Sequence, residues 1–325
     1  MNTIFRWVGF GTAGLTLAVG LIAWATNAKT PLNIPTITLG GKQLWSDVHY
    51  FADWRIQRHV WTGQHRLLDA NNVRRAWGSR EHCRATLENA RGKFNMHQHA
   101  DHLVILLHGI GRSTGTFSKL VEPLKSEGYQ VANISYASTR RGIEDHAKTL
   151  SGLIDGLEGV STVSFVTHSM GGLVLRQLLS EYQPWQDHID IHRIVQIAPP
   201  NQGSVVAKRL KNVWPYRWIY GVAGQQLMPD HVKTLAPLKQ QFGVIVGGTG
   251  EDTGLNPLIE GDDDGTVAVS ETALAGARDR LMINAFHVNI SNHPASIRAV
   301  VNFLKFATFS TPDPSHKTET GDSHA

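Results

Sequence analysis

The sequence predicts an α/β protein: a mostly parallel sheet with helices on both faces, preceded by a small helical region. Two observations indicate this class. With 325 residues, 41% of them hydrophobic, the chain is long enough to bury one large core plus an extra segment. From His102 onward, short apolar runs alternate with amphipathic segments, a pattern typical of repeated βα units and a parallel sheet.

The first 28 residues predict a membrane anchor or a signal peptide. Residues 7–28 carry no charge, and as a helix such a run spans about 30 Å of hydrocarbon. Because the run is longer than the apolar core of most signal peptides, an anchor is favoured. The alternative is a signal peptide that is cleaved after the small residues Ala23 and Ala25.

Two further regions are expected before the sheet, and one after it. Residues 29–43 contain prolines and glycines and predict an extended linker. Residues 44–95 are rich in Trp, Arg and His, and helix-like spacing in NNVRRAWGS and LENARG predicts a helical region packed on the main body. The tail, residues 310–325, has no apolar periodicity and is predicted to be disordered.

Residues 96–309 are predicted to form the α/β domain. The closing helix is SIRAVVNFLKFA, residues 296–307. The predicted strands are residues 102–108, 129–135, 161–168, 192–199, 242–248 and 280–286.

The stretch SFVTHSMGG, residues 164–172, places Ser169 at a predicted strand-to-helix junction. It nearly matches G-x-S-x-G, the turn in which serine hydrolases expose a nucleophilic hydroxyl and which needs small flanking residues. Gly171 meets that requirement, whereas Thr167 stands where the first glycine belongs. The alternative for Ser169 is an ordinary helix N-cap.

A second turn suits a serine nucleophile. HGIG, residues 108–111, ends the first predicted strand of the domain. There the backbone N–H of Ile110, together with that of Met170, is predicted to bind a developing negative charge as an oxyanion hole. The two glycines let the backbone approach the substrate oxygen closely.

An acid and a base follow in the order expected after such a serine. In EGDDDGTVAVS, Asp264 is the predicted acceptor of the histidine N–H, with Asp262 and Asp263 as alternatives. His287 directly follows the last predicted strand and is the predicted general base. His293, the other candidate, precedes a proline that is typical of a helix start.

The segments HGIGRS, ISYASTRRGIEDHA, VTHSMGGLVLR, IAPPNQGS and DDDGTVAVS, in this order and spacing, resemble the bacterial lipase/esterase branch of the α/β-hydrolase superfamily. The resemblance covers residues 102–308. It implies an α/β-hydrolase fold, a triad of Ser169, Asp264 and His287, and an oxyanion hole at Ile110 and Met170. It also implies that no cofactor is needed. Relatives of this kind often carry Ala, Ser or Thr at the position of Thr167.

Residues 204–241 form an insertion in which Trp214, Tyr216 and Trp218 lie among basic residues. Hydrolases of this class carry a cap or lid there, and the composition suits an acyl-chain pocket or a lipid interface. We therefore expect cleavage of lipophilic carboxylic esters through an acyl-enzyme. A thioesterase or an acyltransferase on the same triad, and an inactive membrane-tethered binding protein, are the alternatives.

The expected location is a bacterial inner membrane, with the N-terminal helix as anchor and the catalytic domain in the periplasm. The alternative is an exported soluble protein. The net charge of +4 comes from scattered Lys and Arg, so nucleic acid is not an expected partner. Cys83 is the only cysteine, which rules out an intramolecular disulfide.

A competing metal motif is also present. HQHADH, residues 97–102, matches the H-x-H-x-D-H pattern that holds zinc in binuclear metallohydrolases. There the motif follows a strand, whereas here it leads into one, so we do not expect a functional metal.

Overall fold

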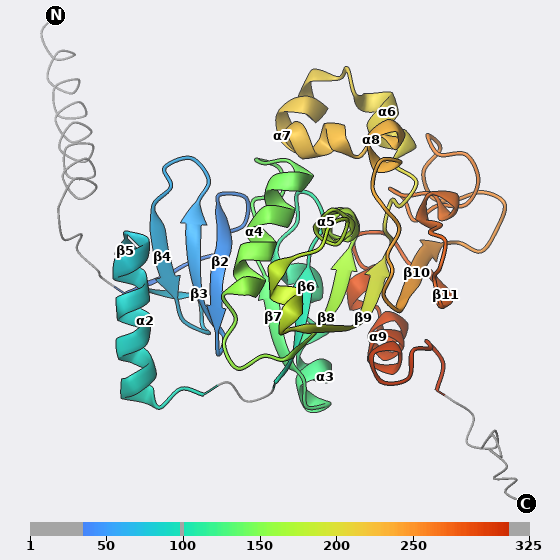
Figure 1. Cartoon of the computed structure of the whole chain (residues 1–325). Helices are drawn as coiled ribbons and strands as arrows, with labels where there is room; N and C mark the ends of the chain where they lie inside the picture. The colour runs from blue at the N-terminus through green and yellow to red at the C-terminus, as the bar shows by residue number, and fades with distance from the viewer. Residues whose placement is uncertain (1–34, 98–100, 312–325) are drawn as a thin grey trace, which may run out of the picture.

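The computed structural model describes residues 35–97 and 101–311 (Figure 1). The predicted anchor or signal segment, residues 1–28, lies outside the described residues, as does the predicted disordered tail from residue 312 on. Within the described ranges, no helix combines the length and apolar character needed to cross a membrane.

A six-stranded parallel sheet forms the centre of the molecule. Its strands are β6 (His102–Leu107), β7 (Gln130–Ile134), β8 (Thr162–His168), β9 (Asp190–Ile197), β10 (Phe242–Gly248) and β11 (Asp279–Asn284). They lie in the order β11-β10-β9-β8-β6-β7, and every neighbouring pair is parallel. The predicted mostly parallel sheet with helices on both faces is confirmed, and each predicted strand is present within two residues of its predicted bounds.

Helices cover both faces of this sheet. One face is packed by α4 (Ile143–Asp155) and α5 (Met170–Leu178), and the other by α3 (Val121–Ser126) and α9 (Pro294–Phe306). Parallel strands need this cover because both of their faces are apolar, and β10 is buried along its whole length. Four short 3₁₀ helices complete this part of the fold: η1 (Thr114–Phe117), η2 (Pro184–Asp187), η3 (Val269–Thr272) and η4 (Ile290–Asn292).

The prediction of a helical region over residues 44–95 is wrong. This region is largely a five-stranded antiparallel sheet in the order β1-β5-β4-β3-β2, with one helix packed on it. The elements are β1 (Thr36–Ile37), β2 (Trp45–Phe51), β3 (Trp54–His59), β4 (His65–Leu68), β5 (Val73–Gly78) and α2 (Arg80–Phe94). The predicted linker, residues 29–43, is likewise part strand, because β1 pairs with β5.

Tight turns explain why this region folds as strands. Ala52 and Asp53 have φ values of 45° and 67° between β2 and β3, and positive φ at both central residues gives the two-residue hairpin turn that matches strand twist. NNVRRAWGS, which has helix-like spacing, supplies β5. The segment LENARG does lie in α2, whose first turn is capped by Ser79 accepting from the His82 N–H.

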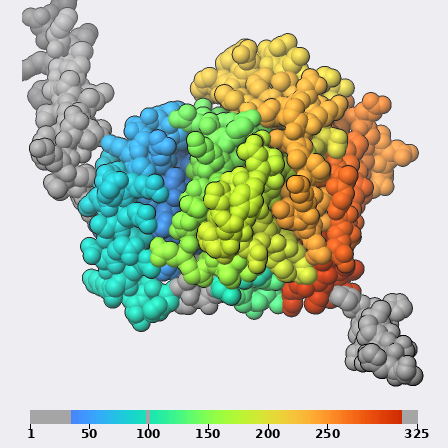
Figure 2. All heavy atoms as spheres, viewed as in Figure 1, coloured from blue at the N-terminus to red at the C-terminus, as the bar shows by residue number. Residues whose placement is uncertain are grey.

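The N-terminal sheet is joined to the β7 edge of the parallel sheet. Tyr50 belongs to the core cluster that α4 and α5 share, and its hydroxyl donates to the Val131 carbonyl at 3.2 Å. The Asp47 N–H donates to the Ser135 carbonyl at 2.8 Å, and the Asp47 carboxylate accepts from the Ser135 N–H at 2.7 Å. Figure 2 shows the N-terminal residues in blue directly against the green α4 region.

The insertion at residues 204–241 forms a small helical cap. It contains α6 (Val205–Leu210), α7 (Trp214–Gln226) and α8 (Pro229–Val232), and it lies at the end of the sheet where the strands finish (Figure 1). Gly221, with a φ of 57°, interrupts α7, and a side chain there would collide with the Thr139 carbonyl oxygen.

Candidate active site

Ser169 lies on the sharp turn between β8 and α5. Its φ of 54° and ψ of −127° are strained for a residue with a side chain, as is typical of a nucleophile turn. The Ser169 N–H donates to the Ile197 carbonyl at 2.9 Å, which fixes the turn against β9. A methyl group on Gly171 would overlap the carbonyl oxygen of Leu107, so only glycine fits there.

Ser169 occupies the N-cap position of α5, yet its side chain makes no capping hydrogen bond. The hydroxyl is therefore not used as an ordinary cap. Thr167, where a glycine was expected, is completely buried at the end of β8. Its Oγ1 atom has no hydrogen-bond partner in the described part of the chain.

His287 and Asp264 form a buried pair at the same end of the sheet. The Nδ1 atom of His287 lies 2.7 Å from the Oδ2 atom of Asp264, and the two residues are 8% and 1% exposed. The other carboxylate oxygen of Asp264 accepts from the backbone N–H groups of Thr266 and Val267 at 3.0 and 2.8 Å. His293, the other histidine considered, instead caps α9.

The two neighbouring acids are used to fold their own loop. Asp262 accepts from the N–H groups of Thr249 and Gly250 at 2.7 and 2.9 Å. Burial acts to raise the pKa of Asp262, but these hydrogen bonds outweigh it, so its pKa lies below the ordinary value. Asp263 accepts from the Asn256 N–H at 3.1 Å. Of the three adjacent aspartates, Asp264 is therefore the one that contacts His287.

His168 brings the serine and histidine turns together, a role that no pattern in the sequence predicted. Its Nε2 atom lies 2.9 Å from the backbone carbonyl oxygen of His287, and the two imidazole centroids are 4.6 Å apart. Burial first, and the neighbouring His287 second, lower the pKa of His168 well below its ordinary value. The sequence signal was a histidine at the buried end of a strand, directly before Ser169.

The HGIG turn, residues 108–111, packs directly against Ser169. A methyl group on Gly109 would lie 2.8 Å from the Cβ atom of Ser169, so the turn and the serine are in close contact. The Gly111 N–H donates to the Ser138 hydroxyl at 3.0 Å. In the described part of the chain, the backbone N–H groups of Ile110 and Met170 donate no hydrogen bond. Both are thus available to an acceptor.

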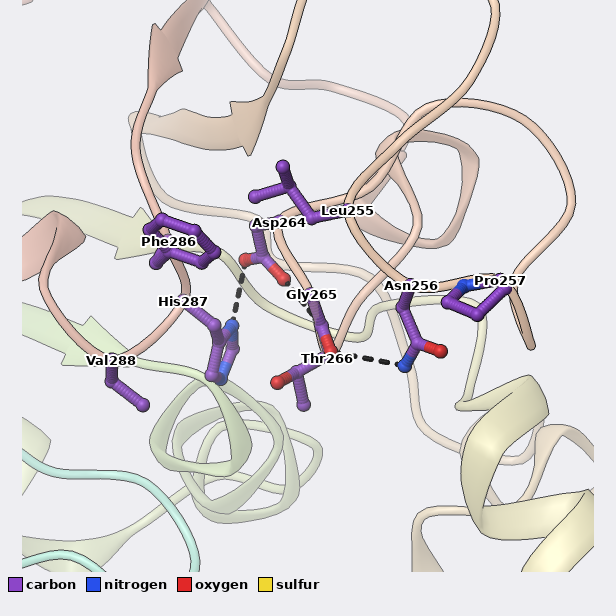
Figure 3. Close-up of a pocket in the computed structure, with 9 residues that line it drawn as sticks. All are labelled: Leu255, Asn256, Pro257, Asp264, Gly265, Thr266, Phe286, His287 and Val288. Atoms are coloured by element: carbon purple, nitrogen blue, oxygen red, sulfur yellow. Dashed lines mark hydrogen bonds and ion pairs between the residues drawn. The ribbon is translucent and has the colours of Figure 1, made fainter.

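A cavity of about 350 Å³ opens beside the acid–base pair (Figure 3). Its lining combines polar atoms of His287 and Asp264 with apolar side chains. The lining residues are Leu255, Asn256, Pro257, Asp264, Gly265, Thr266, Phe286, His287 and Val288. Ser169 is not among them.

The cap reaches the same region. A methyl group on Gly111 would lie 3.6 Å from a ring carbon of Tyr220 in α7, which places the cap over the HGIG turn. The cap also carries apolar side chains that face solvent: Val213, Trp214, Trp218, Ile219 and Val222.

No group of three or more His, Cys, Asp or Glu residues in the described ranges could hold a metal ion. Part of the HQHADH motif, residues 98–100, lies outside the described residues. His102 itself is in β6, with its Nε2 atom 2.9 Å from the Ser164 hydroxyl, and burial lowers its pKa to about 4.

The model of the family described as "Domain of unknown function (DUF7379)" matches residues 67–229. This range includes Ser169 and ends before Asp264 and His287. No curated protein matches the sequence.

Among solved structures, the chain is similar to the lipase BlEst2 of Bacillus licheniformis. The mature form gives a TM-score of 0.50 at 18% identity, covering 63% of this chain and 91% of that chain. The propeptide form gives 0.51 at 17% identity, covering 66% and 52%. A metagenomic carboxyl esterase, MGS0156, gives 0.47 at 17% identity, covering 59% and 66%. The similarity to BlEst2 shows that the chain has an α/β-hydrolase fold.

Proposed function

The chain belongs to the family described as a domain of unknown function, DUF7379, and we propose that it is a serine hydrolase that cleaves carboxylic esters. One observation carries the proposal: the buried 2.7 Å contact between His287 and Asp264, next to the strained turn of Ser169. The α/β-hydrolase fold shared with a bacterial lipase supports it.

In the proposed mechanism, Asp264 accepts the Nδ1–H of His287, which leaves the Nε2 lone pair free to act as a base. His287 takes the proton of the Ser169 hydroxyl as that oxygen attacks the ester carbonyl. The tetrahedral intermediate expels the alcohol, which receives the proton from His287. Water then attacks the acyl-enzyme with the same base, releasing the acid and regenerating Ser169.

The backbone N–H groups of Ile110 and Met170 are the proposed donors to the oxyanion. They flank Ser169, and neither has a hydrogen-bond acceptor among the described residues. Such donors matter because the negative charge develops on the carbonyl oxygen only as the reaction proceeds. Removing one donor typically costs on the order of a hundredfold or more in rate.

We propose a lipophilic ester as the substrate. The exposed Phe286 next to His287 lines the cavity, and the cap adds solvent-facing apolar surface at Trp214, Trp218 and Ile219. Apolar surface near a few polar groups is typical of sites that bind hydrophobic ligands.

Hydrolysis of p-nitrophenyl butyrate and palmitate by the full chain tests this function. We expect turnover that survives a chelator and falls by at least about a thousandfold in Ser169→Ala and His287→Ala. Ser118→Ala, a change at an exposed serine, is the matched control and should retain wild-type rates. Activity that persists in Ser169→Ala, or that disappears with chelator, would contradict the proposal.

The charge-free run at residues 7–28 further supports a proposal that the chain is membrane-anchored, with its catalytic domain outside the cytoplasm. We expect the full chain to remain with membranes after a carbonate wash. Recovery in the soluble fraction would contradict an anchor.

A further inference from the structure

One amide side chain links the N-terminal sheet to the HGIG turn. Gln43 lies just before β2, in a segment outside the parallel-sheet domain. Its Nε2 donates to the carbonyl oxygen of Arg112 at 2.8 Å. Its Oε1 accepts from the Ser138 hydroxyl at 3.1 Å, and from the Thr139 N–H and hydroxyl at 3.0 and 2.9 Å. Donor and acceptor ends of the amide are therefore both used.

Ser138 links Gln43 to Gly111 of the HGIG turn. It is completely buried, and its hydroxyl accepts from the Gly111 N–H at 3.0 Å while donating to Gln43. The turn is thus held at two successive residues, at the N–H of Gly111 and at the carbonyl of Arg112. Ile110, the proposed oxyanion donor, directly precedes the first of these. Fixing the peptide between Ile110 and Gly111, and the Arg112 carbonyl two residues further on, restricts the direction of the Ile110 N–H.

Arg112 extends the connection to the histidine turn. While its carbonyl accepts from Gln43, its guanidinium donates to the carbonyl oxygen of Val288 at 3.0 Å. Val288 directly follows His287. The segment that holds the proposed oxyanion donor therefore lies between the N-terminal sheet and the proposed base.

Hydrogen bonds from neighbouring residues fix the segment that contains Gln43. Gln57 of β3 donates to the carbonyl of Gly40 at 2.9 Å and to the Asp47 carboxylate at 2.7 Å. Asp47 in turn is bound to the Ser135 N–H, in the segment that leads to Ser138. The segment at residues 40–43 is thus fixed between β3 and the parallel sheet, and is not a free linker.

We propose that Gln43 is a positioning residue that orients the oxyanion turn. On this proposal the N-terminal sheet contributes to catalysis although it lies outside the parallel-sheet domain. The inference rests on the proposed ester hydrolase function. A displaced turn weakens binding of the transition-state oxyanion more than binding of the neutral ester, so kcat falls while KM changes little.

The test compares kcat and KM for p-nitrophenyl butyrate among the full-length wild type, Gln43→Ala, Ser138→Ala and the double variant. Gln64→Ala is the matched control, because this glutamine lies in the turn that joins β3 to β4 of the same sheet and its side chain is not part of the connection. We expect Gln43→Ala to lower kcat at least about tenfold with KM within about threefold of wild type. The double variant should be no slower than the slower single variant, because both changes break one chain of contacts.

Amide hydrogen exchange at Gly111 supplies a second readout, and it should accelerate in Gln43→Ala and not in Gln64→Ala. If Gln43→Ala does not fold, Gln43→Glu, which keeps the shape and the acceptor contacts, takes its place with Ser138→Ala. Two results would overturn the role of Gln43 and leave the hydrolase proposal standing. One is a wild-type kcat in the folded variants, and the other is a double variant whose fold-loss in kcat equals the product of the two single losses. A wild type that is inactive, or whose activity survives Ser169→Ala, overturns the hydrolase proposal and this inference together.

Discussion

His168 lies with its Nε2 atom 2.9 Å from the backbone carbonyl oxygen of His287, and so joins the turn of the proposed nucleophile to the turn of the proposed base. Its Nδ1 atom has no hydrogen-bond partner in the described part of the chain. Because burial lowers the pKa of His168 well below its ordinary value, the imidazole stays neutral, with its proton on Nε2. His168 therefore donates its Nε2–H to the backbone carbonyl oxygen of His287, and this hydrogen bond holds the His287 turn in place.

Replacing His168 with Ala should lower kcat for p-nitrophenyl butyrate by about tenfold or more and leave KM nearly unchanged. The physical reason is that the His287 turn loses its donor and the imidazole moves relative to Ser169. His188→Ala, a change at an exposed histidine, is the control and should keep wild-type kinetics. Equal kcat in the two variants would mean that His168 has only a packing role.

The parallel sheet could be predicted from sequence because its strands are buried apolar runs, as in β10, where every residue is buried. Asp264 was predicted as the acid with Asp262 and Asp263 as alternatives, and the sequence could not separate the three because adjacent side chains point in different directions. The folded loop does so, since Asp263 turns toward Asn256. The contacts of Gln43 span 69 to 96 residues, which no local pattern records.

The N-terminal sheet escaped prediction for a different reason. In β3, Arg55 and Gln57 are buried on either side of Ile56. Burial of Gln57 is stabilised by hydrogen bonds with Asp47 and Arg66, so polar side chains occupy positions that an amphipathic strand would give to apolar ones. The period-2 apolar pattern that identifies a strand is limited in β3 to Trp54 and Ile56, which is too short a run to indicate a strand by itself.

Stability is expected to fall as the pH drops below about 6.5, in part because of His108. Its Nδ1 lies 2.9 Å from the Gly109 carbonyl, and its Nε2 accepts from the Tyr136 N–H at 3.3 Å, an arrangement that requires the neutral ring. Burial lowers the pKa of His108 to about 4, against about 6.5 in the unfolded chain. Between these values the unfolded chain binds more protons, so stability rises with pH.

Each such group changes the free energy of unfolding by up to about 1.4 kcal/mol per pH unit in this window. The Tm measured from pH 7 to pH 5 should therefore decrease, with a shallower slope in His108→Gln, whose amide does not titrate. His188→Gln should keep the wild-type slope. Identical slopes in His108→Gln and wild type would show that His108 does not contribute.

Arg176, a residue of α5, is expected to fix both ends of the cap insertion to that helix by hydrogen bonds. Its guanidinium donates to the carbonyl oxygens of Asn201 at 2.9 Å, Leu235 at 2.5 Å and Ala236 at 3.1 Å. Replacement by Met should lower the free energy of unfolding by about 2–4 kcal/mol, because it leaves these carbonyls without their donor. Urea denaturation measures this, with the exposed Arg217→Met as a control expected within about 0.5 kcal/mol of wild type. Similar midpoints for both variants would contradict the prediction.

Two glycines, one at the Ser169 turn and one in α4, should respond in opposite ways to the same added methyl group. In Gly171→Ala the new Cβ overlaps the backbone carbonyl oxygen of Leu107, which cannot move without displacing β6. We expect a loss of about 3 kcal/mol or more in the free energy of unfolding, together with loss of esterase activity as the Ser169 turn opens.

Gly152 lies on the exposed side of α4, and a Cβ atom there meets nothing within 4 Å. Gly152→Ala should therefore stabilise the protein by about 0.5–1 kcal/mol through the higher helix propensity of alanine, and leave the rate of ester hydrolysis unchanged. Urea denaturation and initial rates of ester hydrolysis, both measured on Gly171→Ala and Gly152→Ala, test these expectations. A Gly171→Ala enzyme as stable and active as Gly152→Ala would show that α5 can shift away from β6, and that the close packing of this turn is not required for the nucleophile.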